Sequence, residues 1–287
     1  MCLFLQNFSF TQSFGKIGIF GYTLLITHIC PTLVVYANVC GGYIRVRCNF
    51  KKYMTIIRKT DIEDAGGLSF AIDIAFKKIG SALRVEKDDP KFFPGAFARI
   101  LKDNKFSQVY VAEGKTLYLP DFWRDGVCLA HGATENIEIL AECINFWLTT
   151  NIRTNQLSEK FPFVKPNKDA AIFDDGNEVE YKWQSILNDQ YSTEIKSFVE
   201  LAIKDPILSR LFPYTSLMTL CFSRCTGCPF TRDTPTVTPI YQTDKYLVRT
   251  CDTKEIGSGS ASEALQMVLD NLPGDIKPAV KGTSEDL

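Results

Sequence analysis

Hydrophobic positions follow two different periods in the first half of the chain. Residues 68–79 carry a helical stripe, formed by Leu68, Ala71, Ile72, Ala75 and Ile79. After Pro94 the pattern changes to short runs rich in β-branched and aromatic residues, over residues 97–101, 106–111, 116–123 and 127–130. Glycines separate the last three runs, and glycine supplies the positive φ that tight hairpin turns require. This pattern predicts a helix followed by an antiparallel meander.

Helical spacing returns in the middle of the chain. An apolar stripe over residues 134–148 predicts a helix that Thr134 caps, with Glu135 and Glu138 placed favourably against the helix dipole. Four apolar positions on one stripe predict each of two further helices, over residues 179–187 and 195–202.

Strand-like runs dominate again after residue 216. They cover residues 217–222, 236–241, 246–251 and 254–256. Ser260 and Glu263 form a capping box before a last amphipathic helix. Because strand runs and helix runs segregate along the chain, we expect an α+β fold of antiparallel meander sheets with packed helices. The order of the runs favours two meander-plus-helix lobes around a helical middle.

The first 54 residues form an apolar, basic leader, and residues 55–287 form the expected α+β globular domain. Residues 17–44 carry no charge and are long enough to cross a bilayer as a helix, although His28 and Pro31 lie within them. Three interpretations stay open: a gene start placed too early, with Met54 as the real beginning; a membrane anchor; and a targeting segment. The first two interpretations place the globular domain in the cytoplasm. We expect contact with a membrane only if residues 1–54 are part of the translated protein.

Charge is distributed unevenly along the chain. The formal net charge is -1, but no acidic residue occurs before Asp61. Without residues 1–54 the chain has 27 basic and 33 acidic residues, a net charge of -6. Such a body lacks the basic surface expected of a protein that neutralises phosphates, so we do not expect nucleic acid as a partner.

The ten cysteines have irregular spacing, which argues against a disulfide scaffold. Cys128 and Cys143 are expected to be buried thiols that act as small apolar side chains. Cys221, Cys225 and Cys228 have the C-x3-C-x2-C spacing of radical S-adenosylmethionine enzymes. Those enzymes place this loop after the first strand of a βα barrel, whereas only 59 residues follow Cys228 here.

A zinc site at Cys225, Cys228 and Cys251 would need a fourth ligand, and the sequence contains one Cys-x-x-Cys pair where a strong zinc signal has two. These cysteines and Cys221 are therefore weak metal candidates, and we expect neither a metal nor a cofactor. Nucleotide-binding glycine motifs and a G-x-S-x-G nucleophile motif are lacking in the sequence as well.

Two groups of residues are candidates for a functional site. His131 is the one histidine after residue 54, and Cys225 beside Arg224 could act as a nucleophile because a guanidinium favours the thiolate. The aromatic and acidic stretch 119–126 could line a ligand pocket. The ligand-binding candidates are Asp121, Trp123, Arg124 and Asp233.

Two segments carry a family resemblance: Leu211-Phe-Pro-Tyr-Thr-Ser with the following Arg224-Cys-Thr-Gly-Cys-Pro-Phe-Thr, and Asp121-Phe-Trp-Arg-Asp-Gly-Val-Cys-Leu-Ala-His-Gly-Ala-Thr. Together with Phe161-Pro-Phe and Pro278-Ala-Val-Lys-Gly-Thr, they resemble a bacterial family of unknown function labelled natural product biosynthesis protein. The resemblance covers about residues 60–283. Its pattern includes Arg224 and Cys225 but does not require Cys221 or Cys228. It implies no reaction or cofactor.

Two hypotheses about function follow. The first is a cytoplasmic accessory protein that binds a protein partner in natural product biosynthesis or toxin defence. The alternative is an enzyme or small-ligand-binding protein with a site around Arg224 and Cys225, in which Arg224 clamps an anion. The sequence leaves the oligomeric state, and whether the protein is an enzyme, undecided.

Overall fold

The computed structural model describes residue 62 and residues 65–86, 97–112, 117–189 and 193–287, together with three strands nearer the N-terminus. These strands pair antiparallel in the order β1-β2-β3. They are β1 (Leu24–Thr27), β2 (Leu33–Val39) and β3 (Gly42–Cys48). The rest of the leader, and its boundary at residue 54, lie outside the described residues, so its three interpretations stay predictions. In the described part of the chain, no helix has both the length and the hydrophobicity to cross a membrane.

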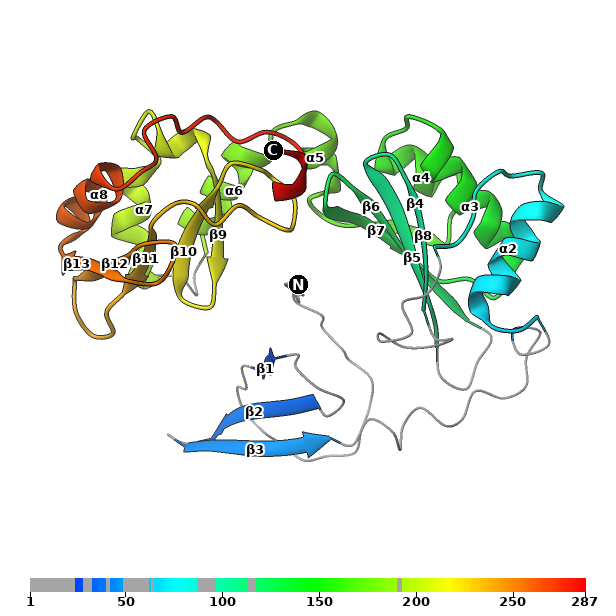
Figure 1. The fold of residues 1–287 in the computed structure, drawn as a ribbon, viewed down its shortest axis with the longest axis horizontal. Coiled ribbons are helices and arrows are strands. Elements are labelled where there is room, and N and C mark those ends of the chain that lie inside the picture. The colour runs from blue at the N-terminus through cyan, green and yellow to red at the C-terminus, as the bar shows by residue number, and fades with distance from the viewer. Residues whose placement is uncertain are drawn as a thin grey trace.

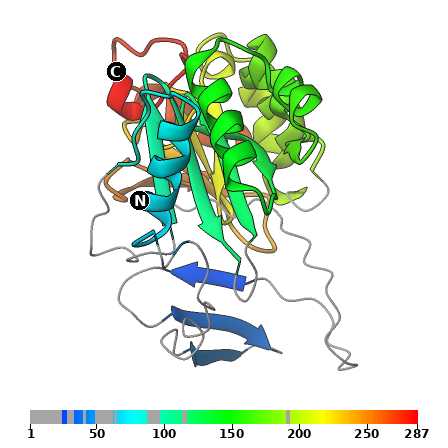
Figure 2. The same ribbon diagram turned by 90° about the vertical axis from the view of Figure 1, so that its right-hand side faces the viewer.

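The first lobe is a five-stranded antiparallel meander with helices on one face (Figures 1 and 2). Its strands are β4 (Phe97–Lys102), β5 (Lys105–Val111), β6 (Tyr118–Arg124), β7 (Val127–Gly132) and β8 (Val164–Pro166), in that spatial order. Its helices are α2 (Leu68–Lys78), α3 (Ile137–Thr149), α4 (Thr154–Lys160) and α5 (Ala170–Asp175).

The core of the first lobe lies between this sheet and helices α2 and α3. Alternate residues of each strand are buried there, as in Ala98 and Ile100 of β4. Phe122 of β6 meets Trp147 of α3 edge to face, with ring centroids 6.1 Å apart. Fully burying side chains of this size stabilises the fold by about 1.5–3 kcal/mol each. The opposite side chains of the strands point away from the helices.

The second lobe repeats this architecture with a second meander, in the order β9-β10-β11-β12-β13. Its core includes Trp183, Phe198, Phe222 and Val268, which are fully or almost fully buried. The strands are β9 (Phe212–Ser216), β10 (Thr219–Ser223), β11 (Thr236–Pro239), β12 (Tyr246–Arg249) and β13 (Glu255–Gly259). The helices are α6 (Glu178–Leu187), α7 (Lys196–Ala202) and α8 (Ala261–Asp270), with 3₁₀ turns at Thr193–Ile195, Leu208–Arg210 and Ser284–Asp286. The predicted α+β fold of meander sheets and packed helices is therefore confirmed.

Two local predictions need correction. The N-cap of α3 is Asn136 and not Thr134, because the Asn136 Oδ1 atom accepts hydrogen bonds from the backbone N–H groups of Glu138 and Ile139 at 2.9 and 3.0 Å. The expected strand 217–222 is one half of a hairpin, because the chain turns at Leu217 and pairs β9 with β10. The capping box of Ser260 and Glu263 at the start of α8 is confirmed.

Candidate functional site

The candidate site lies on the face of the first sheet that points away from α2, α3 and α4, which we call the outer face (Figure 1). Strand register aligns its side chains in rows that cross the strands. The middle row is polar or charged throughout. Its members are Arg99, Gln108, Asp121, His131 and Lys165.

Apolar and aromatic rows flank this polar row on both sides. Phe106 and Trp123 stack with their ring centroids 5.1 Å apart, and the Arg99 guanidinium lies 4.4 Å from the centroid of Phe106. Leu101 and Tyr110 are the most exposed members, at 45% and 40%. One row contains Leu101, Phe106, Trp123 and Cys128, and the other contains Phe97, Tyr110 and Leu119.

A β-bulge brings Cys128 into this surface beside His131. Residues three apart in a regular strand point to opposite faces, because side chains alternate with a period of two. In β7 the register shifts so that Trp123 faces Cys128 while Phe122 faces Ala130, which leaves Leu129 as the extra residue. Cys128 and His131 therefore both reach the outer face. Bulges of this kind commonly re-aim side chains beside functional sites.

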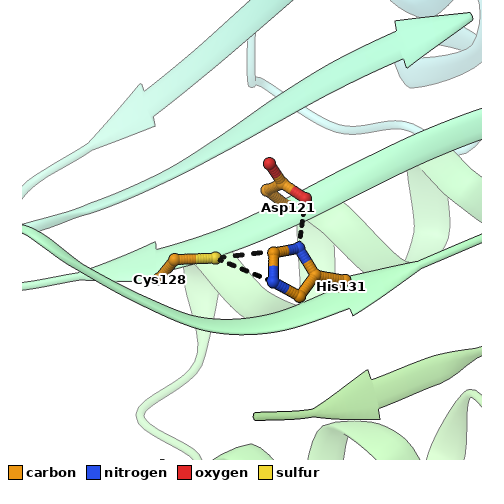
Figure 3. Close-up of side chains that lie close together, drawn as sticks. All are labelled: Asp121, Cys128 and His131. Carbon is orange, nitrogen blue, oxygen red and sulfur yellow. Dashed lines mark hydrogen bonds and ion pairs between the residues drawn. The ribbon is translucent and has the colours of Figure 1, made fainter. Parts of the chain in front are cut away.

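Asp121, Cys128 and His131 form a compact cluster on β6 and β7 (Figure 3). The Nδ1 atom of His131 lies 2.6 Å from the Oδ1 atom of Asp121. The Sγ atom of Cys128 lies 3.8 Å from Nε2 and 3.9 Å from Nδ1 of the same ring. All three side chains are partly exposed, and their donor atoms lie within 4.8 Å of one another.

The electrostatics of the cluster disfavour a free thiolate. Burial raises the pKa of the Cys128 thiol well above its ordinary value, and the nearby Asp121 carboxylate raises it further. Nucleophilic cysteines need the opposite, a pKa lowered by positive charge. The arrangement of Cys, His and Asp is therefore a poor thiol nucleophile. Its sulfur, nitrogen and oxygen donors are instead a set that binds transition metals.

Of the predicted ligand-binding residues, Asp121 and Trp123 lie on the outer face, whereas Arg124 points to the opposite one. There Arg124 pairs with Asp174 of α5 and donates to the Ile152 carbonyl at 3.1 Å. The Nε1 atom of Trp123 is buried and has no acceptor among the described residues. Within the stretch 119–126, Arg124 therefore has a structural role in an ion pair, whereas Asp121 and Trp123 belong to the outer face.

The predicted Arg224 and Cys225 lie in the second lobe, apart from His131. Cys225 is fully buried, with its Sγ atom 3.5 Å from the Gly227 carbonyl oxygen and 3.6 Å from that of Pro229. Arg224 pairs with Asp233 at 2.6 Å. The Oδ1 atom of Asp233 is buried with no hydrogen-bond partner in the described part of the chain.

The four cysteines that were weak metal candidates do not form a group of possible metal ligands among the described residues. Among the described residues, the cluster of Asp121, Cys128 and His131 is the one group of three or more candidate ligands, so it includes none of the four cysteines proposed from spacing. Cys221 and Cys225 are buried, and Cys251 is exposed in the turn after β12. The expectation that these four cysteines bind no metal stays a prediction from the sequence.

The segment Arg224–Pro229 joins the two lobes. The backbone N–H of Gly227 donates to the Gly282 carbonyl at 2.7 Å, and that of Cys228 donates to the Gly126 carbonyl in the β6–β7 turn at 3.1 Å. The tail that follows α8 thus meets this segment and the first lobe at one place, which we call the lobe junction. A Cβ atom on Gly227 would lie 1.8 Å from the Asp125 carbonyl oxygen, so this position requires glycine.

Sequence reasoning missed Cys128 as part of the site. Of the two cysteines expected to be buried, Cys143 is fully buried but Cys128 is only partly so. The spacing Cys128-x-x-His131 was the available signal. A strand period of two placed these residues on opposite faces, and only the bulge in β7 changes that.

The comparisons with known proteins concern mainly the second lobe. Residues 177–283 match the model of a family of unknown function, DUF6193. This range contains the lobe junction segment and the tail, and it excludes the outer face of the first sheet. No curated protein and no solved structure matches the chain. Over residues 177–283, the chain is therefore similar to a family whose function is unknown.

Proposed function

We propose that the chain is a partner-binding protein whose outer face receives a protein. The buried Nε1–H group of Trp123, which has no acceptor among the described residues, is the observation that carries the proposal. An unsatisfied buried donor costs about 1–3 kcal/mol. Because this nitrogen is buried while the Trp123 side chain is partly exposed, a partner recovers this free energy if the side chain turns outward on binding and pairs with an acceptor of the partner.

The residue types of the outer face suit a protein partner. Trp, Tyr and Arg are the residues most enriched among those that dominate binding energy at protein interfaces, and Trp123, Tyr110 and Arg99 are all present. Apolar rows on either side of a polar row also match the mixed composition of such interfaces. The net charge of -6 after residue 54 makes nucleic acid the weaker alternative.

The biological setting of this proposal is a cytoplasmic accessory role in natural product biosynthesis or toxin defence. Its support is the sequence resemblance carried by residues 121–134 and 211–231. A small-molecule site around Arg224 and Cys225 is less well supported, because the Cys225 thiol is fully buried and Arg224 is already paired with Asp233.

Capture from the native host with matched baits tests the proposal. The baits are the full chain, a Tyr110→Asp variant on the outer face, and a Tyr241→Asp control in the second lobe, where Tyr241 is 78% exposed. We expect the wild type and the control to recover the same protein. Recovery by Tyr110→Asp should fall at least about tenfold, as for a residue worth about 1.4 kcal/mol.

Calorimetric titration of each bait with the purified partner then measures the affinity directly. Because Tyr110 and Tyr241 are exposed, both variants should keep the wild-type melting temperature within a few degrees. Equal affinity of Tyr110→Asp and the wild type would refute the outer face as the docking surface. Recovery of no specific protein by any bait would refute partner binding itself.

A further inference from the structure

We propose that Asp121, Cys128 and His131 bind one divalent transition metal ion, with zinc preferred, and leave a fourth coordination position open on the outer face. Metal binding by these three side chains needs no protein partner. This proposal and the docking proposal can therefore fail separately.

The distances within the cluster are close to those of a zinc site. With Zn–S of about 2.3 Å and Zn–N or Zn–O of about 2.0 Å, neighbouring donors of a tetrahedral site lie about 3.3–3.6 Å apart. One ring nitrogen of His131 can bind a given ion, and we take Nδ1, which lies 3.9 Å from Cys128 Sγ and 2.6 Å from Asp121 Oδ1. Each of these two distances differs from the tetrahedral value by less than 1 Å, so small rotations of the partly exposed side chains, which lie together in Figure 3, would bring them into range.

The donor set selects the class of metal. A thiolate and an imidazole favour zinc and its neighbours, whereas calcium and magnesium prefer oxygen ligands alone. On binding, the Cys128 thiol releases its proton to solvent, and the resulting thiolate and the Asp121 carboxylate together balance the two positive charges of the ion. Without a cation, two adjacent anions at this place would repel each other.

The backbone around Cys128 is fixed by Asn167, which follows β8. Its backbone N–H donates to the Leu129 carbonyl at 2.8 Å, and its side-chain Nδ2 donates to the Cys128 carbonyl at 2.8 Å. These two bonds satisfy carbonyls at the bulge where β7 departs from regular pairing with β6. A bulge that is hydrogen-bonded in this way holds Cys128 on the face of His131, which a metal site requires.

The three ligands come from rigid strands and leave the solvent side of the ion uncovered. His131 is 41% exposed and Asp121 is 23% exposed. A site with three protein ligands and one open position is typical of zinc that binds a further group. That group would be water, or a donor atom of whatever binds the outer face.

Cobalt titration of the full chain is the first test, because cobalt(II) reports a thiolate ligand by a charge-transfer absorption band. We expect one equivalent to bind with this band present. Cys128→Ser should abolish the band, and His131→Gln and Asp121→Asn should each weaken binding at least about tenfold. The control Cys251→Ser removes an exposed cysteine of the second lobe and should leave both the band and the affinity unchanged.

Protection from alkylation tests the same site without any substitution, so a folding defect of a variant cannot decide the result. Zinc should slow alkylation of Cys128 in the wild type at least tenfold, measured by peptide mass spectrometry, and should leave the rate at Cys251 unchanged. Binding of less than one equivalent, a charge-transfer band that survives in Cys128→Ser, or equal alkylation rates at Cys128 with and without zinc would each overturn the proposal.

Discussion

Gly227 at the lobe junction offers the sharpest test of the fold. In Gly227→Ala, the new Cβ atom would lie 1.8 Å from the Asp125 carbonyl oxygen and 2.8 Å from that of Gly282. Cβ atoms in proteins essentially never approach a neighbour closer than 3.0 Å, so the backbone must move by about 1.2 Å. The neighbouring atoms belong to the backbone, so no side-chain rotation can relieve the overlap.

The expected loss of stability follows from these contacts. A shift of this size breaks the bonds from Gly227 N to Gly282 O and from Cys228 N to Gly126 O. Each hydrogen bond contributes about 1 kcal/mol, and overpacking adds about 1–3 kcal/mol. We therefore expect Gly227→Ala to lower the free energy of unfolding by about 3–5 kcal/mol.

Urea denaturation followed by tryptophan fluorescence measures this loss. With a slope of about 2 kcal/mol per molar urea, the midpoint should fall by about 2 M. Gly274→Ala is the matched control, because a Cβ atom there would meet nothing within 4 Å. Its midpoint should stay the same or rise slightly, since alanine restricts the unfolded chain. If both variants unfold at the same urea concentration, the steric account of the lobe junction is wrong.

Two further substitutions test local features by the same measurement. Leu217 is 73% exposed and has a φ of 56°, so Leu217→Gly should relieve strain and raise the free energy of unfolding by about 0.5–1 kcal/mol. The control Met218→Gly should lower the free energy of unfolding. A lower free energy of unfolding in both variants would contradict the strain at Leu217. Asp174→Ala removes the carboxylate that pairs with the largely buried guanidinium of Arg124 and should lower the free energy of unfolding by about 3–5 kcal/mol. Asp175→Ala removes a more exposed ion pair with Arg153 and should lower it by less than about 1 kcal/mol. Equal losses of stability would refute the argument that burial makes the Arg124 pair more important.

The elements with strong periodicity could be predicted from the sequence. The stripe over residues 68–79 becomes α2, and the runs between residues 97 and 130 become β4 to β7, because burial on one face imposes a regular spacing of apolar residues. The β9–β10 hairpin could not be predicted, because Leu217 and Met218 are not turn-forming types. Leu217 nonetheless adopts a positive φ, since the pairing of the flanking strands leaves two residues to reverse the chain.

The candidate site was only half predictable for a similar reason. Asp121, Trp123 and His131 stood out by residue type, but their grouping depends on the register of β6 and β7. Cys128 joins them through one extra residue in a strand, which no periodic pattern reveals. The Arg224 and Cys225 segment was conspicuous in sequence for its cysteine spacing, but the close backbone contacts of Gly227 give it a structural role at the lobe junction.

The lobe junction also constrains the order in which the protein can fold. Each sheet pairs strands that are neighbours in sequence, so each lobe can form from short-range contacts soon after its own residues are synthesised. The bond between Gly227 and Gly282 requires the tail, which follows both sheets in the chain. During synthesis the two lobes can therefore form as separate units first, and the bond to Gly282 completes the lobe junction only in the last step.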